Sequence, residues 1–328
     1  MGMKVRLNGR KRFKKDTSTN FRVANIAPRV EEIFKNTAQS NRILVLSAHT
    51  NDPQMLAIQA KALKKYLKFD YDFIVGIDLP PIDSKWNLFK EIGFKKFEEV
   101  ALLHSIKLLE IPGAIHLDRS YIFPNGNPAS KKPDFAKRCA DTFQFMLGII
   151  PWQQYSTVLY LDADMFPISP IQEIPTSYLV SVAGVKQIRK KWLREYIYFW
   201  PGLVWLDARS PMRNLLSFDL ISRFSLKTDV GGETNSWIRF LTSFGYEARF
   251  LRHLQSGTWD ETNAPESVLN NPELLEWLKN DYRNVNNLFF AEIYDEKFLH
   301  YRGGGNWMLN EPHNETANRD GLSTALRL

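Results

Sequence analysis

The sequence predicts an α/β fold with a mostly parallel central sheet flanked by helices, and a smaller elaboration in the C-terminal half. Two observations predict it. Short apolar strands alternate with helical patterns through the first half of the chain, and the second half continues with less regular strands and helices. Apolar strands that alternate with helices are typical of parallel sheets covered on both faces.

The first elements show the alternation clearly. Residues 43–48 form a short apolar strand, followed by the polar turn 49–52 and by Pro53, which is typical of a helix start. Apolar residues then recur at helical spacing as far as Leu67. A second strand over 73–77 ends at Asp78. These steps predict two βα units.

The remaining elements are assigned by the same patterns. A third strand is predicted at 114–117, and Pro133 opens a helix that leads to the strand ending at Asp162. No internal repeat and no linker rich in Pro, Ser or Gly divides the chain. The second half is predicted to contain strands at 179–184 and 202–206 and helices at 234–244 and 272–279.

Composition limits the class of protein. The chain has 328 residues, of which 44% are hydrophobic and 13% aromatic, so it can bury a large core. Its single cysteine, Cys139, excludes an intrachain disulfide and a thiolate zinc cluster, and fits a reducing compartment. No apolar stretch approaches ~18 residues. We therefore expect a soluble, cytoplasmic protein with one domain over residues 21–328.

The net charge of +7 is concentrated at the N-terminus. Residues 1–15 contain seven basic side chains and no acid, so the rest of the chain is balanced. We interpret residues 1–20 as a solvated, poorly ordered basic arm, which leaves peripheral contact with an anionic membrane open. The balanced body argues against a nucleic-acid-binding protein. The basic residues are Lys4, Arg6, Arg10, Lys11, Arg12, Lys14 and Lys15.

The run 158–167, Val-Leu-Tyr-Leu-Asp-Ala-Asp-Met-Phe-Pro, is the most informative motif. A buried strand ends at Asp162 and Asp164, and Pro167 closes the run. Where a strand breaks, two such carboxylates can turn to one hard divalent cation, Mn²⁺ or Mg²⁺, which in turn binds a diphosphate. The carboxyl end of a sheet strand is where open α/β sheets bind ligands. The alternative is an Asp-rich turn with no ligand.

A second chemical element follows near the C-terminus. Residues 300–307 read His-Tyr-Arg-Gly-Gly-Gly-Asn-Trp. Three glycines let backbone amides approach an anion closely, Arg302 can pair with phosphate, and His300 can offer a neutral imidazole to a cation. The alternative is a flexible glycine turn. The pairing with the Asp-Ala-Asp motif favours a diphosphate site.

Together these motifs resemble the GT-A superfamily. The strand-helix-strand order, the strand end Leu-Asp-Ala-Asp-Met at 161–165 and the late His-x-x-Gly element are similar to the glycogenin-like and galactosyltransferase-like retaining enzymes, family 8. Those are metal-dependent transferases that use nucleoside diphosphate sugars. The resemblance implies that Asp162, Asp164 and His300 bind Mn²⁺ or Mg²⁺.

The resemblance extends to further positions. It implies phosphate contacts from a helix before the metal motif, a nucleotide pocket at the first two strand ends, and a Gly-Gly-Asp-Gln-like element at 231–235 beside the sugar. Glu233 or Asp229 would act there, although either can simply cap the next helix. The residues implied in donor binding are Ala48, His49, Thr50, Asp78, Lys137, Arg138, Asp162, Ala163, Asp164, Arg302, Gly303 and Gly304.

Two departures from the family pattern affect the sugar and phosphate contacts. Trp200-Pro201-Gly202 stands where the family has Asn-Ser-Gly, and Asn306-Trp307 stands where the family has a lysine before Pro-Trp. Arg302 or a neighbouring base would then contact the phosphate. Tyr198 and Trp200 belong to an aromatic cluster, and either is a candidate for stacking on the acceptor.

The resemblance implies a hexosyl- or pentosyltransferase that moves a sugar from a nucleoside diphosphate sugar, expected to be a UDP-sugar, to a glycan, protein or lipid hydroxyl with retention. Residues 42–170 would bind the donor and 171–310 the acceptor, before a tail at 311–328. Inversion stays open, with Asp229 or Glu233 as the general base. The alternatives are a nucleotidyltransferase, which would show a Gly-rich basic signature after its first strand, and a nucleic-acid-binding protein that acts through the arm.

Overall fold

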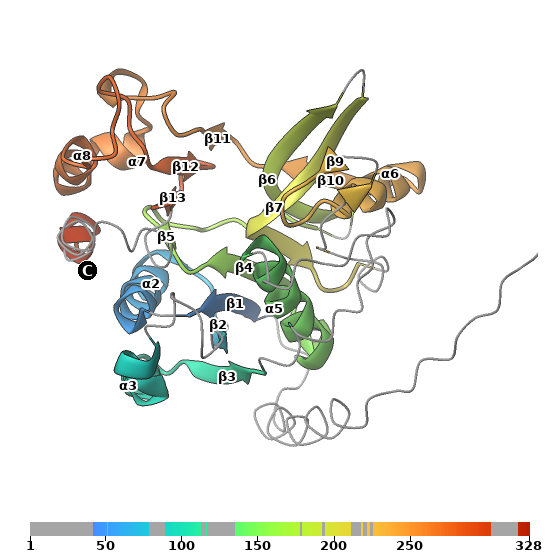
Figure 1. Cartoon of the computed structure of the whole chain (residues 1–328), viewed down its shortest axis with the longest axis horizontal. Helices are drawn as coiled ribbons and strands as arrows, with labels where there is room; N and C mark the ends of the chain where they lie inside the picture. Colours follow the sequence, from blue (N-terminus) through green and yellow to red (C-terminus); the bar gives the residue numbers. More distant parts are fainter. Residues whose placement is uncertain are drawn as a thin grey trace, which may run out of the picture. The chain divides into compact units, whose positions relative to one another are not determined.

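The structure is a computed structural model (Figure 1). It describes residues 42–50, 52–78, 89–112, 116, 135–177, 179–191, 194–210, 218, 222–223, 226–302 and 321–328. All of them belong to one compact unit within Asn36–Leu328. The predicted basic arm, Gly303 and Gly304 lie outside the described residues.

A seven-stranded sheet forms the centre of the described unit. Its strand order is β10-β6-β7-β4-β1-β2-β3. All neighbouring pairs are parallel except β6–β7 and β4–β7, which are antiparallel, so the mostly parallel α/β sheet is confirmed. The strands are β1 (Ile43–His49), β2 (Tyr71–Asp78), β3 (Lys107–Ile111), β4 (Thr157–Asp162), β6 (Val180–Lys191), β7 (Arg194–Asp207) and β10 (Glu247–Phe250).

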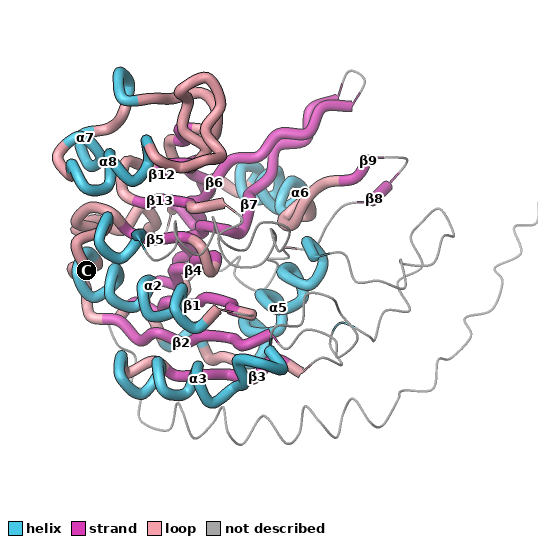
Figure 2. The backbone as a smooth tube through the Cα atoms, turned by 60° about the vertical axis from the view of Figure 1, so that its left-hand side comes forward, coloured by secondary structure: helices cyan, strands magenta, loops and turns pink. Residues whose placement is uncertain are grey.

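Helices cover both faces of this sheet (Figures 1 and 2). Val45 of β1 packs with Leu56 and with Phe97, which lie on two helices of one face. On the other face, Gly76 of β2 approaches Met146 so closely that an added Cβ would lie 2.8 Å from its sulfur. The helices are α2 (Pro53–Tyr66), α3 (Phe89–His104), α5 (Phe135–Ile149), α6 (Thr234–Ser243), α7 (Glu266–Leu269) and α8 (Pro272–Lys279).

A smaller antiparallel sheet adjoins the end of β4. Its strand order is β11-β12-β13-β5, and β5 follows β4 after a two-residue turn. The sheet therefore joins the Asp-Ala-Asp turn to the C-terminal half, as the predicted elaboration requires. Its strands are β5 (Met165–Pro167), β11 (His253–Leu254), β12 (Glu292–Tyr294) and β13 (Phe298–His300); the remaining elements are the pair β8 (Ser222–Arg223) and β9 (Leu226–Lys227) and the 3-10 turns Trp152–Gln154 and Glu261–Asn263.

Most predicted elements are confirmed, and local chemistry explains their limits. Asp52 caps α2 by accepting from the backbone N–H groups of Gln54 and Met55, and Pro53 occupies its first turn. The third strand was misplaced. Strand β3 is Lys107–Ile111, whereas His116, the one described residue of the predicted strand 114–117, is helical. Strand β3 carries one charged residue on each of its two faces, Lys107 and Glu110. It therefore lacks the continuous apolar run that made β1 recognisable in the sequence.

No helix in the described part of the chain is both long enough and apolar enough to span a bilayer.

Candidate active site

The Asp-Ala-Asp turn lies directly beside His300. Asp162 is the last residue of β4, and Asp164 stands in the turn that leads into β5. Met165 pairs with His300 across the antiparallel β5–β13 ladder. This register brings Asp164 Oδ1 to 3.3 Å from His300 Nε2, and both side chains are buried. The structure thus brings together two of the three predicted metal ligands.

The third predicted ligand is adjacent but turned to the backbone. Asp162 Oδ1 accepts from the N–H of Ala163 at 2.9 Å. Burial, followed by the charge of Asp164, raises the pKa of Asp162 to about 7. The negative charge of the buried Asp164 thus opposes ionisation of the partly buried Asp162.

Glu292 lies behind His300 and was not predicted. Its Oε2 is 2.9 Å from His300 Nδ1 and accepts from the Tyr294 hydroxyl at 2.6 Å. Its Oε1 lies 3.5 Å from His253 Nε2. Burial alone would raise the pKa of Glu292, but hydrogen bonds from His253, His300 and Tyr294 hold it well below its ordinary range. Glu292 therefore remains a carboxylate that fixes the imidazole of His300.

His300 is held between two acids. Burial by itself lowers the pKa of His300, but the charge and hydrogen bond of Asp164, reinforced by Glu292, raise it to about 9. A carboxylate on Nδ1 is the usual partner of a histidine that binds a metal through Nε2, because it fixes the tautomer and the ring orientation. The arrangement fits a metal ligand whose Nε2 proton is displaced by the cation.

The carboxylate and imidazole groups of this site suit a hard divalent cation whose remaining ligands come from the substrate. Carboxylate and imidazole groups suit Mn²⁺, and Mg²⁺ is bound through carboxylate oxygens. Within the described residues no group of three or more His, Cys, Asp and Glu side chains is placed to hold an ion by itself. Ions of this kind are commonly bound through one or two carboxylates together with substrate phosphates, so a complete protein cage is not required.

Gln59 of α2 holds the Asp-Ala-Asp turn by hydrogen bonds and was also not predicted from the sequence. Its Nε2 donates to the carbonyls of Asp162 at 2.8 Å and Met165 at 2.9 Å, which bracket the turn. Its Oε1 lies 3.1 Å from His49 Nε2. Burial lowers the pKa of His49 to about 4, so the ring is neutral, and it donates to Gln59 because the amide nitrogen is already in use. The predicted residue His49 thus supports the turn through Gln59.

The strand ends predicted to line a nucleotide pocket are neighbours in the sheet. Ala48 pairs with Asp162 across β1–β4 and with Gly76 across β1–β2. Thr50 follows at the end of β1 and is partly buried. The predicted nucleotide contacts of these residues stay predictions.

Asp78 and Arg138 contact each other. Arg138 donates from Nε to Asp78 Oδ2 at 3.1 Å and from Nη2 to Oδ1 at 2.6 Å. His116 Nε2 lies 2.9 Å from Asp78 Oδ1, and its Nδ1 lies 3.3 Å from Asp141 Oδ2. All but Asp141 are buried. Asp78 and Arg138 would therefore contact the donor, as predicted, only while they remain paired with each other. The side chain of Lys137 is outside the described part of the structure.

The aromatic cluster divides into core and site residues. Tyr198 is fully buried and donates to Gln187 Oε1 at 2.8 Å, so it is not available for stacking. Trp200 is partly exposed, and its ring centroid lies 4.9 Å from that of His300. An added Cβ at Gly202 would meet the Trp200 ring at 2.0 Å, so glycine is required for this packing. Of the two predicted residues, Trp200 is the one that borders the site.

The segment 228–235 also packs against β7, next to Phe199 and Pro201. Gly231 has φ +88° and approaches Phe199 so closely that a Cβ would lie 1.9 Å from its carbonyl oxygen. Asp229 accepts from the N–H of Val230 at 2.8 Å, and its charge contributes to the raised pKa of Asp162. Glu233 precedes α6 and makes no side-chain cap. Of the two, Asp229 is thus the one whose charge acts on the Asp-Ala-Asp turn.

Arg302 lies at the edge of the site. Its Nε is 3.8 Å from Glu292 Oε2, its guanidinium lies 5.1 Å from the Phe290 ring centroid, and its side chain is 41% exposed. Arg283 donates to the carbonyl of Arg302 at 2.7 Å and is itself paired with the buried Asp281. The backbone that enters the glycine run is thereby fixed.

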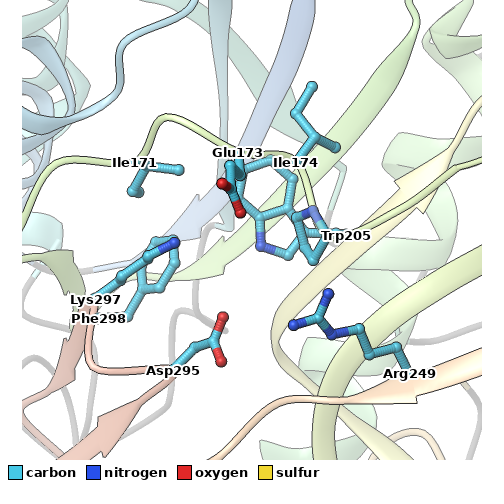
Figure 3. Close-up of a pocket in the computed structure, with 9 residues that line it drawn as sticks. Ile171, Glu173, Ile174, Trp205, Arg249, Asp295, Lys297 and Phe298 are labelled. Carbon is cyan, nitrogen blue, oxygen red and sulfur yellow. The ribbon is translucent and has the colours of Figure 1, made fainter.

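A separate pocket lies away from these residues (Figure 3). It is bounded by the connection that follows β5, by Trp205 of β7 and by the β12–β13 turn, and it contains none of the predicted site residues. Charged side chains of both signs face it, namely Glu173, Arg249, Asp295 and Lys297. We assign no chemistry to it.

The missed residues had weak sequence signals. Glu292 and His300 are eight residues apart on either side of Asp295-Glu296, a spacing that suits a hairpin in which the two face each other, as the Glu292↔His300 pairing shows. Gln59 had no comparable signal, because a single polar residue on a helix gives no indication of which distant carbonyls it meets.

The chain was compared with family models, curated proteins and solved structures. No family model matches it, and no curated protein does. Among solved structures it is similar to the galactosyltransferase LgtC in complex with donor and acceptor sugar analogs, at 12% identity and a TM-score of 0.29. That match covers 51% of this chain and 58% of LgtC.

Two further structures are similar. The bifunctional glycosyltransferase WbbM matches at 11% identity and a TM-score of 0.34, over 64% of this chain and 38% of WbbM. The mannosyltransferase Ktr4p from S. cerevisiae matches at 12% and 0.33, over 60% of this chain and 68% of Ktr4p. TM-scores this low carry no conclusion about the function of this chain.

Proposed function

We propose that this chain is a metal-dependent glycosyltransferase of the GT-A type that transfers a sugar from a nucleoside diphosphate sugar, a UDP-sugar, to a hydroxyl of a glycan, protein or lipid, with retention. The observation that carries the proposal is the contact of Asp164 with His300 at the carboxyl end of β4, with Glu292 fixing the imidazole from behind. Buried acids and a buried histidine at a strand end are expected where a cationic cofactor completes the charge balance.

Asp164 and His300 would hold the Mn²⁺ or Mg²⁺ ion, and Asp162 would join them directly or through water. When bound, the cation supplies positive charge that stabilises the diphosphate as it departs. The chain's own residues organise the site around it. Gln59 fixes the turn that carries both acids, and Glu292 fixes the ring of His300, so the ligands need little reorganisation on binding.

Arg302 and Trp200 border this position from two directions. Arg302 is partly exposed beside Glu292, where its guanidinium would pair with phosphate oxygens of the donor. Trp200 lies against His300, where its partly exposed side chain would contact the sugar and limit access of water to the reacting bond. Trp200 would then help to determine which sugar fits.

Retention or inversion depends on where the acceptor attacks. In retention, the acceptor hydroxyl approaches the face from which the diphosphate leaves, and the departing phosphate oxygens accept its proton. In inversion, Asp229 would act as a general base on the opposite face. Replacing Asp229 with Asn would then abolish turnover, whereas a retaining reaction would persist, and nuclear magnetic resonance of the product's anomeric proton reports the configuration directly.

Calorimetry with UDP tests the metal site first. We expect UDP to bind the full chain in the presence of Mn²⁺ and to bind at least about 100-fold more weakly without it, because the ion and its ligands stabilise the diphosphate. Asp164→Asn and His300→Ala should each remove the Mn²⁺-dependent part. Asp70→Asn, an exposed carboxylate beyond the other end of β2, is the matched control.

The chemistry is tested with a panel of nucleotide sugars. Release of the nucleoside diphosphate from each donor is measured with and without Mn²⁺. Mn²⁺-dependent release from one donor, lost in Asp164→Asn but not in Asp70→Asn, supports a transferase. Release of pyrophosphate from a nucleoside triphosphate and a sugar phosphate would instead indicate a nucleotidyltransferase and overturn the proposal. UDP binding that is unchanged in both site variants would overturn the metal assignment.

A further inference from the structure

Strands β6 and β7 continue beyond the central sheet as a two-stranded ribbon (Figures 1 and 2). Strand β6 pairs with β10 as far as Gly184, and β7 pairs with β4 from Leu203 onward. Between these limits, in the described structure, residues 185–191 and 194–200 pair only with each other. At ~3.3 Å per residue, the ribbon extends roughly 20 Å from the sheet.

The ribbon is strongly basic. Residues 186–195 contain five basic side chains and the single acid Glu195, although the chain beyond residue 15 is balanced overall. Lys186 and Lys190 are exposed on the same face, since they are four residues apart on one strand. The Lys190 side chain is 77% exposed, and its ion pair with Glu195 leaves most of the positive charge uncompensated. The basic residues are Lys186, Arg189, Lys190, Lys191 and Arg194.

An apolar side chain lies within this positive surface. Ile188 stands between Lys186 and Lys190 on their face of the ribbon and is 41% exposed. In the sequence, Trp192 and Leu193 separate the last residue of β6 from the first of β7. Basic residues that surround an exposed aliphatic side chain are typical of surfaces that insert shallowly into the headgroup region of a membrane.

The base of the ribbon is anchored independently of this surface. Asn235 Nδ2 donates to the carbonyl of Ile197 at 2.8 Å, and the N–H of Phe199 donates to Thr234 Oγ1 at 2.8 Å. The hydroxyl of Tyr198 donates to Gln187. The first two contacts are to the backbone of β7, and Tyr198 and Gln187 point to the opposite face of the ribbon from Lys186, Ile188 and Lys190. Lys186 Nζ also lies 5.4 Å from the Phe250 ring centroid, so Ile188 and Lys190 are the residues of this face that take no part in these contacts.

We propose that the exposed face of this ribbon docks on an anionic membrane surface. Lys186 and Lys190, which outnumber the single acid Glu195 on this face, complement acidic lipid headgroups, and Ile188 would be removed from water by the headgroup region. A nucleic acid would share the charge complementarity, but Ile188, the exposed apolar side chain between the two lysines, cannot stack on bases, whereas the headgroup region of a membrane can bury it. Trp200 at the base of the ribbon borders the candidate site, so docking would place that site within about 20 Å of the lipid, a consequence that rests on the proposed function.

Vesicle sedimentation of the full chain tests the proposal without any donor or acceptor. We expect binding to vesicles of equal parts phosphatidylcholine and phosphatidylglycerol, and none to phosphatidylcholine alone. Reversing two charges with Lys186→Glu and Lys190→Glu should weaken the binding at least about tenfold. Ile188→Ser should weaken it about threefold and retain that effect in high salt, because burial of apolar surface is not screened.

A matched double variant separates the ribbon from general charge. Lys95→Glu and Lys96→Glu change two exposed lysines of α3 by the same amount and should leave vesicle binding within about twofold of the original. Equal losses in both double variants would overturn the proposal, since binding would then follow net charge or the N-terminal residues. Loss of single-stranded RNA binding in the ribbon variant, with vesicle binding unchanged, would also overturn it in favour of a nucleic-acid surface.

Discussion

Two groups of largely buried ionisable side chains lie at the carboxyl ends of β2 and β4, the parallel strands on either side of β1, and they differ in how their charges are balanced. At the end of β2, which we call the β2 cluster, Asp78 is paired through both oxygens with Arg138 and also contacts His116. At the end of β4 and β13, the β4 cluster contains three acids around one buried histidine. The acids of the β4 cluster are Asp162, Asp164 and Glu292.

The difference indicates which cluster needs a ligand. In the β2 cluster a bidentate guanidinium satisfies the carboxylate, so folding alone completes it. In the β4 cluster the imidazole of His300 is shared between Asp164 and Glu292, and burial together with the charge of Asp164 raises the pKa of Asp162 to about 7. A buried excess of negative charge is costly unless a proton or a metal ion joins it. We therefore regard the β2 cluster as part of the scaffold and the β4 cluster as the binding centre.

The largest expected difference is in stability. Asp78→Asn should lower the free energy of unfolding by about 3–5 kcal/mol, because it leaves the Arg138 guanidinium buried without its countercharge. Asp164→Asn removes one of two opposed carboxylates as well as the partner of His300, so we expect a net change below about 1 kcal/mol. Urea denaturation of both variants measures this directly. Equal losses would contradict the distinction between the clusters.

Removing the support beneath the β4 cluster is the next test. Gln59→Leu leaves the carbonyl of Asp162 and the N–H of His49 without their partner in a buried region, which should cost about 2 kcal/mol of stability. Because the turn then loses its fixed position, Mn²⁺-dependent UDP binding should also weaken about tenfold. Gln54→Leu, at an exposed position of the same helix, is the control. A loss of stability with no change in UDP binding would limit Gln59 to a structural role.

Glu292 provides a narrower test of the same cluster. Glu292→Gln keeps a group that can accept from His300 Nδ1 but removes its charge, so we expect Mn²⁺ affinity to fall about 10- to 100-fold. Glu296→Gln changes a neighbouring acid of the same hairpin, whose partner is Arg252, and should have little effect. Calorimetric titration with Mn²⁺ in the presence of UDP measures both variants. An unchanged affinity in Glu292→Gln would remove Glu292 from the metal site.

The sequence predicted the local parts of this arrangement better than the distant contacts. Strand β4 and its terminal acids were correctly placed because an apolar run followed by acids and proline is a local signal. The approach of Asp164 to His300 was proposed from a family resemblance, and the structure now shows the contact. Its cause, the β5–β13 register, depends on three-residue strands that have no distinctive pattern.

Other features required knowledge of tertiary packing. The pairing of Asp78 with Arg138 joins a strand end to a helix 60 residues later, so the two were assigned separately to a nucleotide. Gln59 reaches residues more than 100 positions away. Hydrogen bonds of this kind depend on how a helix is placed over the sheet, which hydrophobic periodicity does not determine. The roles of Lys137, Gly303 and Gly304 in donor binding stay predictions.

The pH dependence of stability gives the smallest effect per step, about 1 kcal/mol per pH unit, and distinguishes the ionisation of the β4 cluster from its packing. The pKa of Asp162 rises from 3.8 to about 7, so without metal this residue's contribution to stability declines as pH rises through that window. The pKa of His300 rises from 6.5 to about 9, so its contribution is present below 6.5 and is lost as pH rises toward 9. Between pH 5 and 9 each of the two residues should lower stability by roughly 1 kcal/mol per pH unit within its own window.

Asp162→Asn should remove the decline in stability below pH 7 and leave the decline between pH 7 and 9. Mn²⁺ with UDP should reverse the trend, because the ion displaces these protons and binds more tightly as pH rises. Thermal unfolding across this range, with and without Mn²⁺, decides between this behaviour and a flat profile, which would show that the acids of the β4 cluster are already balanced without a cation.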